Sequence, residues 1–203
     1  MAIKSLQHSS ITDNIFYRSM LAGNAAFDPG DEDILAEQVL SSSAASVTFS
    51  GLDTLAAGYQ HLQIRMVARS DDSGSSNLRD LRIQVNADTG TNYSSHVLRG
   101  DGASVSSNAA SSQDSINTAL SMFPRPSNPT TQYGAAIIDV LDAFETTKYT
   151  TIRMLGGAKP DGEDQIWLGS GLWQNTNALT EIKIFANVGN LAGNSRFTLI
   201  GLK

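Results

Sequence analysis

Short runs in which apolar and polar residues alternate are the feature that most constrains the fold of this chain. In the run HLQIRMVARS, Leu62, Ile64 and Met66 fall on one side of an extended strand, and the polar residues, including Arg69, fall on the other. Segments rich in Gly, Ser, Asn and Asp, typical of turns, separate these runs. About eight to ten short strands without a long helix predict an all-β protein, either an antiparallel β-sandwich or a barrel. Further alternating runs are found at residues 81–86, 92–100, 134–141, 149–157, 164–173, 180–188 and 195–203.

The alternation also predicts which side chains face the core. Successive side chains of a strand point to opposite faces, so a slip of one residue would turn a whole set toward solvent. The predicted core residues are Leu62, Ile64, Leu81, Ile83, Val85, Ile138, Val140, Ile182, Ile184, Phe197 and Leu199.

Two segments lack a clear alternation. Residues 100–113 consist mostly of Gly, Ser, Ala and Asn, so they are expected to form a loop. Residues 114–122 are expected to form either a helical turn or a wide loop between sheets.

The N-terminal residues 1–44 differ from the rest of the chain and are expected to form an arm, with the sandwich domain at residues 45–203. The arm carries scattered apolar residues and the turn-like sequence FDPGDED at residues 27–33. Such an arm suits a segment that becomes ordered on a partner. The alternative is that it lies across its own sandwich and completes the core. The candidate docking residues are Ile11, Ile15, Phe16 and Leu21.

Composition excludes several classes of protein. The 203 residues contain 14 Lys and Arg against 20 Asp and Glu, giving a net charge of −6, and the cations are scattered, which argues against nucleic-acid binding. The absence of cysteine excludes disulfide scaffolds, cysteine zinc sites and thiol nucleophiles. No apolar run suggests a signal peptide or a membrane span, so no membrane association is expected.

No motif points to catalysis, and the protein is expected not to be an enzyme. The three histidines, His8, His61 and His96, show no metal-binding spacing, and neither a nucleophile elbow nor a phosphate-binding loop is present. No cofactor and no metal are therefore expected. The acidic loops at residues 28–33 and 86–92 could offer oxygen ligands to calcium, but a solvated turn and a tight hairpin, respectively, explain them better.

Two aromatic residues are candidates for contact with a glycan, Tyr93 and Trp173. Trp173 lies just before a turn and is the better candidate for exposure. The alternative, which we favour, is that large aromatic side chains such as Trp167 and Trp173 pack in the sandwich.

The chain resembles a widespread family of bacteriophage virion proteins, described as tail-fibre or structural proteins. The matching sequences are SSSAASVTFSGLDTLAAGYQHLQI near residues 42–64, QVNADTGTNYSSHVLRGDG at 84–102, and GLWQNTNALTEIKIFANVGNLAGNSRFTLIGLK at 171–203. The resemblance implies a jelly-roll-like β-sandwich and a non-enzymatic structural role in the virion, which would assemble in the host cytoplasm.

The resemblance favours a tail- or fibre-associated protein attached through its N-terminal arm. Decoration or cementing of the capsid head is an alternative, and so is a carbohydrate-binding module for receptor recognition. Other virion proteins are the expected partners, with a host surface glycan as a further partner in the last case. Closed rings hide the open strand edges of a sandwich, so we also expect a homotrimer.

Overall fold

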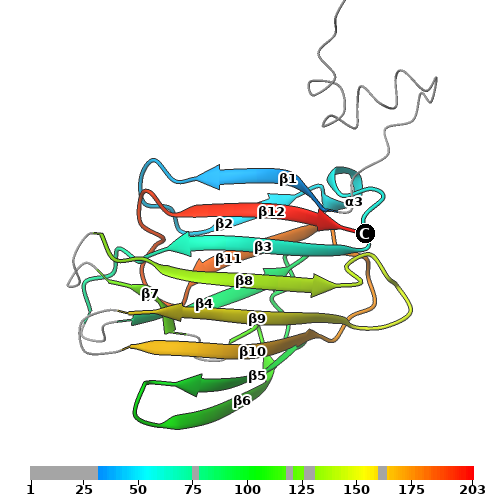
Figure 1. Ribbon diagram of the computed structural model, residues 1–203. Helices are drawn as coiled ribbons and strands as arrows, with labels where there is room; N and C mark the ends of the chain where they lie inside the picture. Colours follow the sequence, from blue (N-terminus) through cyan, green and yellow to red (C-terminus); the bar gives the residue numbers. More distant parts are fainter. Residues whose placement is uncertain (1–31, 75–77, 118–120, 126–130, 160–163) are drawn as a thin grey trace, which may run out of the picture.

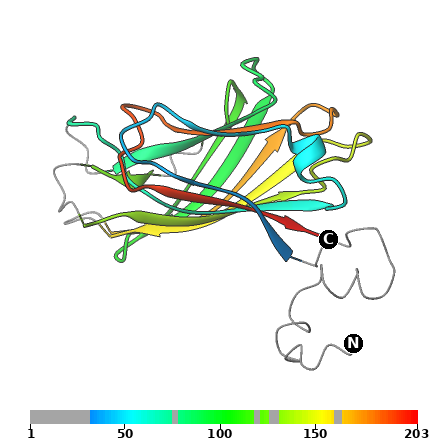
Figure 2. The same cartoon turned by 90° about the horizontal axis from the view of Figure 1, so that it is seen from above.

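The computed structural model describes residues 32–74, 78–117, 121–125, 131–159 and 164–203. These residues form two antiparallel sheets packed face to face, which confirms the predicted all-β sandwich (Figure 1, Figure 2). Figure 1 looks onto the larger sheet, and the smaller sheet lies behind it.

The larger sheet has eight strands in the order β1-β12-β3-β8-β9-β10-β5-β6, and the smaller sheet has four in the order β2-β11-β4-β7. A helix of four residues, α3 (Leu52–Leu55), connects β2 to β3. The strands are β1 (Glu32–Val39), β2 (Val47–Ser50), β3 (His61–Ala68), β4 (Leu78–Val85), β5 (Tyr93–Gly100), β6 (Val105–Gln113), β7 (Ser121–Pro124), β8 (Gly134–Leu141), β9 (Thr150–Ala158), β10 (Gln165–Trp173), β11 (Glu181–Ala186) and β12 (Arg196–Leu202).

Eight of the strands pair in a nested order, in which strands early in the chain pair with strands late in the chain and the strands between them pair with each other. In the larger sheet β1 pairs with β12 and β3 with β8, and in the smaller sheet β2 pairs with β11 and β4 with β7. The chain crosses between the sheets after β1, β2 and β3. The other four strands, β5, β6, β9 and β10, extend the larger sheet well beyond the smaller one.

The predicted core is confirmed. All eleven predicted residues are at most 1% exposed, because the alternation turns each of them toward the space between the sheets. Phe123 and Ile116, which lie in or beside segments without alternation, are buried there as well.

The predicted boundary between arm and sandwich is wrong. Residues 32–39 form β1, an edge strand that pairs with β12, and Ala44 forms an antiparallel bridge with Leu191. The strand was hard to detect because a bulge between Ile34 and Ala36 interrupts the alternation. The candidate docking residues lie outside the described residues: Ile11, Ile15, Phe16 and Leu21.

One further expectation is corrected. Residues 105–113 are not a loop but strand β6, which pairs with β5 at the free edge of the larger sheet. The segment 114–122 leads from β6 in the larger sheet to β7 in the smaller sheet, and its described part contains no helix, which favours the connection between sheets over the helical turn. Almost every residue of β6 is exposed, so no alternation marked the strand.

Arg69 does not point to solvent as expected and is only 5% exposed. It follows the last residue of β3, where loops from other parts of the chain cover it. Its guanidinium donates a hydrogen bond to the backbone oxygen of Arg125 at 2.7 Å and lies 5.6 Å from the ring centre of Tyr133.

Candidate functional site

The outer face of the larger sheet carries a row of exposed leucine and isoleucine side chains. Ile137 of β8 is opposite Leu155 of β9, which is opposite Leu168 of β10, which in turn is opposite Leu98 of β5. Each of the four side chains is 41–51% exposed. We call this continuous row across four strands the apolar ridge.

A second row runs parallel to the ridge, two residues farther along each strand. Three of its positions, Ala135, Gly157 and Gly100, have a methyl group or no side chain. These small residues leave the backbone of the sheet open beside the ridge. From β3 to β6, the whole second row consists of Val67, Ala135, Gly157, Ile166, Gly100 and Val105.

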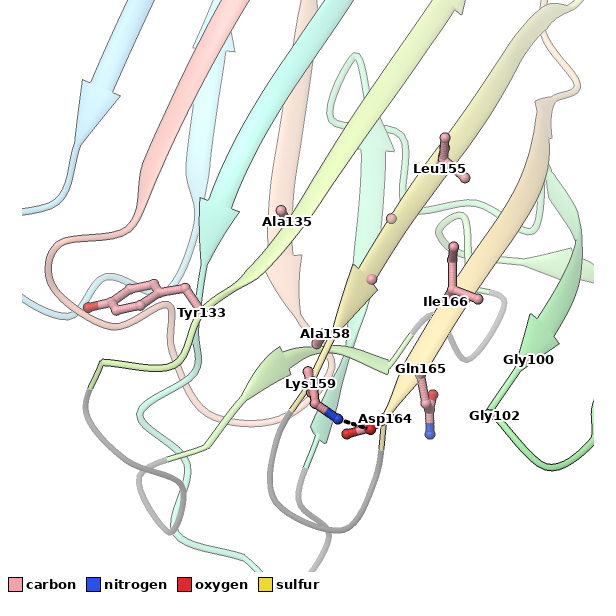
Figure 3. A pocket seen from close by; sticks show the side chains of 12 residues that line it. Gly100, Gly102, Tyr133, Ala135, Leu155, Ala158, Lys159, Asp164, Gln165 and Ile166 are labelled. Atoms are coloured by element: carbon pink, nitrogen blue, oxygen red, sulfur yellow. Dashed lines mark hydrogen bonds and ion pairs between the residues drawn. The ribbon is translucent and has the colours of Figure 1, made fainter.

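Two hollows open over the small residues of the second row. The first, of about 550 Å³, extends over Gly157 and Gly100, with Leu155 and Ile166 projecting beside it (Figure 3). An ion pair between Lys159 and Asp164 lies at its far side.

The second hollow, of about 400 Å³, extends over Ala135 between Val67 and Ile137. Leu155 and Ala135 line both hollows, so the ridge and the two hollows form one continuous surface.

A hydrogen-bonded polar belt borders the other side of the ridge. The Asp139 carboxylate, 9% exposed, accepts hydrogen bonds from Arg153 at 2.7 Å and from Gln63 at 2.7 Å. Arg65 donates to the Gln63 side chain at 2.7 Å and pairs with Glu32 at 2.7 Å. The belt therefore crosses from β9 to β1 and holds its charges in fixed positions.

This arrangement suits contact with another macromolecule. The ridge and the second row together cover on the order of 300 Å², and the largest apolar patch on a protein surface, commonly of this size, is often functional. An apolar centre beside a polar border is the usual anatomy of a protein interface. Among the residues that the structure describes, no group of three His, Cys, Asp or Glu side chains could hold a metal ion.

This face was not predicted from the sequence, although the sequence carries a signal for it. In each of the four strands of the ridge an outward apolar residue stands next to an inward one, as with Ile137 beside Ile138 and Leu155 beside Met154. Leu168 likewise follows the buried Trp167. Strands that are apolar on both faces indicate a second buried surface.

The two candidate glycan contacts, Tyr93 and Trp173, are not on the surface. Tyr93 is fully buried and Trp173 is 1% exposed, so neither side chain is available to a glycan. The two residues are opposite each other in β5 and β10, and both side chains point between the sheets. The favoured prediction, that Trp167 and Trp173 pack in the sandwich, is confirmed.

The loop at residues 86–92 is not a hairpin, because β4 and β5, which it connects, belong to different sheets. The left-handed positions are Asn86 and Ala87, both with φ 52°, rather than the glycine. Asp88 organises the loop, accepting hydrogen bonds from Trp173 Nε1 at 2.7 Å and from the Gly90 N–H at 2.8 Å.

The hydrogen bond from Trp173 is the main reason that the pKa of Asp88 is lowered, and the side chain of Asn92 also donates to this carboxylate. These donors already occupy the oxygens that a calcium ion would need. The loop is therefore a structural connection between the sheets.

Replacing Asp88 by asparagine should weaken the pH dependence of stability. Because the folded-state pKa of Asp88 is lowered, its charge stabilises the fold above the ordinary pKa of about 3.8, and this contribution is lost as the pH falls through the folded-state value. The free energy of unfolding, measured in urea from pH 6 to pH 2.5, should thus fall less in Asp88→Asn than in the unchanged protein. Equal slopes for the two proteins would contradict this role.

The histidines do not form a site within the described part of the chain. The Nδ1 atom of His61 accepts a hydrogen bond from the Asp142 N–H at 2.9 Å. His96 is in β5, and three strands of the sheet separate it from His61 in β3. His8 lies outside the described residues.

Comparison with protein-family models finds no match to this chain, and comparison with curated protein sequences finds none either. Among the described residues, no helix has the length and apolar content that a membrane span requires.

Proposed function

We propose that the protein is a non-enzymatic structural protein of a bacteriophage virion, and that the outer face of its larger sheet packs against a neighbouring virion subunit. The observation that supports this most is the apolar ridge with its hollows and polar belt. A rigid, hydrogen-bonded sheet holds these side chains in place, as a permanent assembly requires. The resemblance of residues 42–203 to virion proteins points in the same direction.

The strand order supports the jelly-roll-like fold that the resemblance implies. A jelly roll has eight strands in two sheets. The nested pairs β1·β12, β3·β8, β2·β11 and β4·β7 provide such a set of eight, and β5, β6, β9 and β10 are then additions to one sheet.

Within this proposal the protein is associated with the tail or a fibre, and residues 1–31 attach it to the virion. These residues contain the apolar side chains of Ile11, Ile15, Phe16 and Leu21. The alternative is decoration or cementing of the head. In either case the protein assembles into virions in the host cytoplasm.

Labelling of purified virions with an antibody against this protein tests the proposal. Label on the tail or its fibres is the expected result, and label on the head favours the decoration alternative. The proposed function would be contradicted if the antibody did not label virions in which other structural proteins are detected.

Glycan recognition is the remaining alternative, and the burial of Tyr93 and Trp173 removes the residues that suggested it. A glycan array with the full chain tests it separately from virion labelling. Specific binding to one glycan class would favour a receptor-recognition module.

A further inference from the structure

We infer that the partner on the outer face of the larger sheet is a second copy of this chain, related by a twofold axis that runs across the strands between the ridge and the second row. This inference rests on the proposed use of this face as a contact surface. The neighbouring subunit on this face is then a second copy of the same chain.

The shape of this face is self-complementary under that symmetry. A twofold axis parallel to the two rows exchanges them, so the ridge of one copy lies over the second row of the other. Position along the axis is unchanged, so each strand lies over its own counterpart. Ile137 of one copy therefore comes over Ala135 of the other, and Leu98 comes over Gly100.

At the centre of the contact, Leu155 of one copy comes over Gly157 of the other. Three of the four ridge side chains thus meet a position with a methyl group or no side chain, where the hollows of about 550 and 400 Å³ open. Large residues opposite small ones allow facing layers to interdigitate as in a sandwich core. The fourth, Leu168, meets the apolar Ile166.

The size of the face agrees with a stable dimer. Six strands from β3 to β6, spaced about 4.8 Å apart and about 27 Å long, present on the order of 800 Å². A standard protein interface buries about 800 Å² on each partner. The apolar rows form the centre of this area.

The charges of the face are compatible with self-association. The polar belt of one copy comes over the side of the other copy that carries Lys159 and Asp164. Each side is internally paired, Arg153 with Asp139 and Lys159 with Asp164, so neither brings an excess of one charge. The contact therefore avoids like-charge repulsion.

A twofold contact differs from the homotrimer expected from the sequence. A threefold ring joins two different surfaces of each copy, whereas a twofold contact joins one surface to itself. The parallel ridge and hollows are a self-complementary pair of features on one surface, so they favour the twofold arrangement.

Sedimentation of the full chain at micromolar concentrations tests the inference. The expected mass is twice the 21.6 kDa of one chain. Leu155→Glu places a charge at the centre of the contact and should raise the dissociation constant at least about tenfold, while the monomer stays folded because Leu155 is 51% exposed in the single chain. The matched control is Val188→Glu, at a 48% exposed position between β11 and β12, which should remain dimeric.

Disulfide formation tests the geometry, since the chain contains no cysteine. A mixture of the single variants Ile137→Cys and Ala135→Cys should form a mixed disulfide dimer under mild oxidation. The matched control mixes Ile137→Cys with Ile34→Cys, which lies on β1 at the far edge of the sheet, and should not form one.

The inference would be overturned by a monomer at all micromolar concentrations, by a mass of three chains, or by an equal yield of disulfide in the control mixture. A disulfide within one chain of the double variant Ile15→Cys/Ile137→Cys would overturn it by assigning the face to the N-terminal segment. The two proposals fail separately. If the protein is a monomer but the antibody labels virions, only the dimer is overturned. If the protein is a dimer but the antibody does not label virions, only the proposed function is overturned.

Discussion

Replacing Trp173 by alanine should lower the free energy of unfolding by about 3 to 5 kcal/mol. The side chain is 1% exposed, and its loss would leave a large cavity between the sheets. It would also remove the N–H that donates to Asp88, so the loop from β4 to β5 would lose its strongest anchor. Urea unfolding followed by circular dichroism measures the effect, and the Tm should fall by roughly 10 °C.

Trp173→Phe separates the two contributions. Phenylalanine retains most of the aromatic packing against Tyr93 but leaves Asp88 without the indole donor, which should cost about 1 to 3 kcal/mol. If alanine cost less than about 0.5 kcal/mol, as at an ordinary surface position, Trp173 would not be part of the core.

Alternation was sufficient to predict the strands that have one buried face. Ile182 and Ile184 are an example, because the polar residues beside them leave only one arrangement that buries both. The same logic failed for β6, in which neither face is buried. At Trp173 the alternation holds: this residue lies on the same face of β10 as Trp167, and both side chains are buried between the sheets.

The outer face could not be predicted from alternation because its strands are apolar on both sides. Alternation that places Ile138 and Trp167 in the core turns their neighbours Ile137 and Leu168 to the opposite face, and it does not say what covers that face. Only the register across the sheet brings Ile137, Leu155, Leu168 and Leu98 into one row, and register between strands distant in the chain depends on the whole topology.

The position at which the chain is shortened should decide whether the sandwich remains stable. A chain beginning at Ser42 lacks β1, which would leave β12 as the edge of the sheet. Leu35, which packs against the core, would be lost, and Ile200, which is opposite Ile34 and only 2% exposed, would be uncovered. Two such side chains correspond to about 4 kcal/mol, so we expect the cooperative thermal transition to weaken strongly or disappear.

A chain beginning at Glu32 is the matched control. It keeps β1 and the hydrogen bond that Tyr59 donates to Asp33 at 2.8 Å. Burial and this hydrogen bond together raise the pKa of Tyr59 to about 12. We expect its melting to match that of the full chain, since every described contact is retained. Attachment can then be tested with a folded domain: if the chain beginning at Glu32 melts normally but is no longer incorporated into virions, residues 1–31 are the anchor. Normal incorporation would show that the attachment surface lies on the sandwich itself, and an unchanged melt for the chain beginning at Ser42 would contradict the stabilising role of β1.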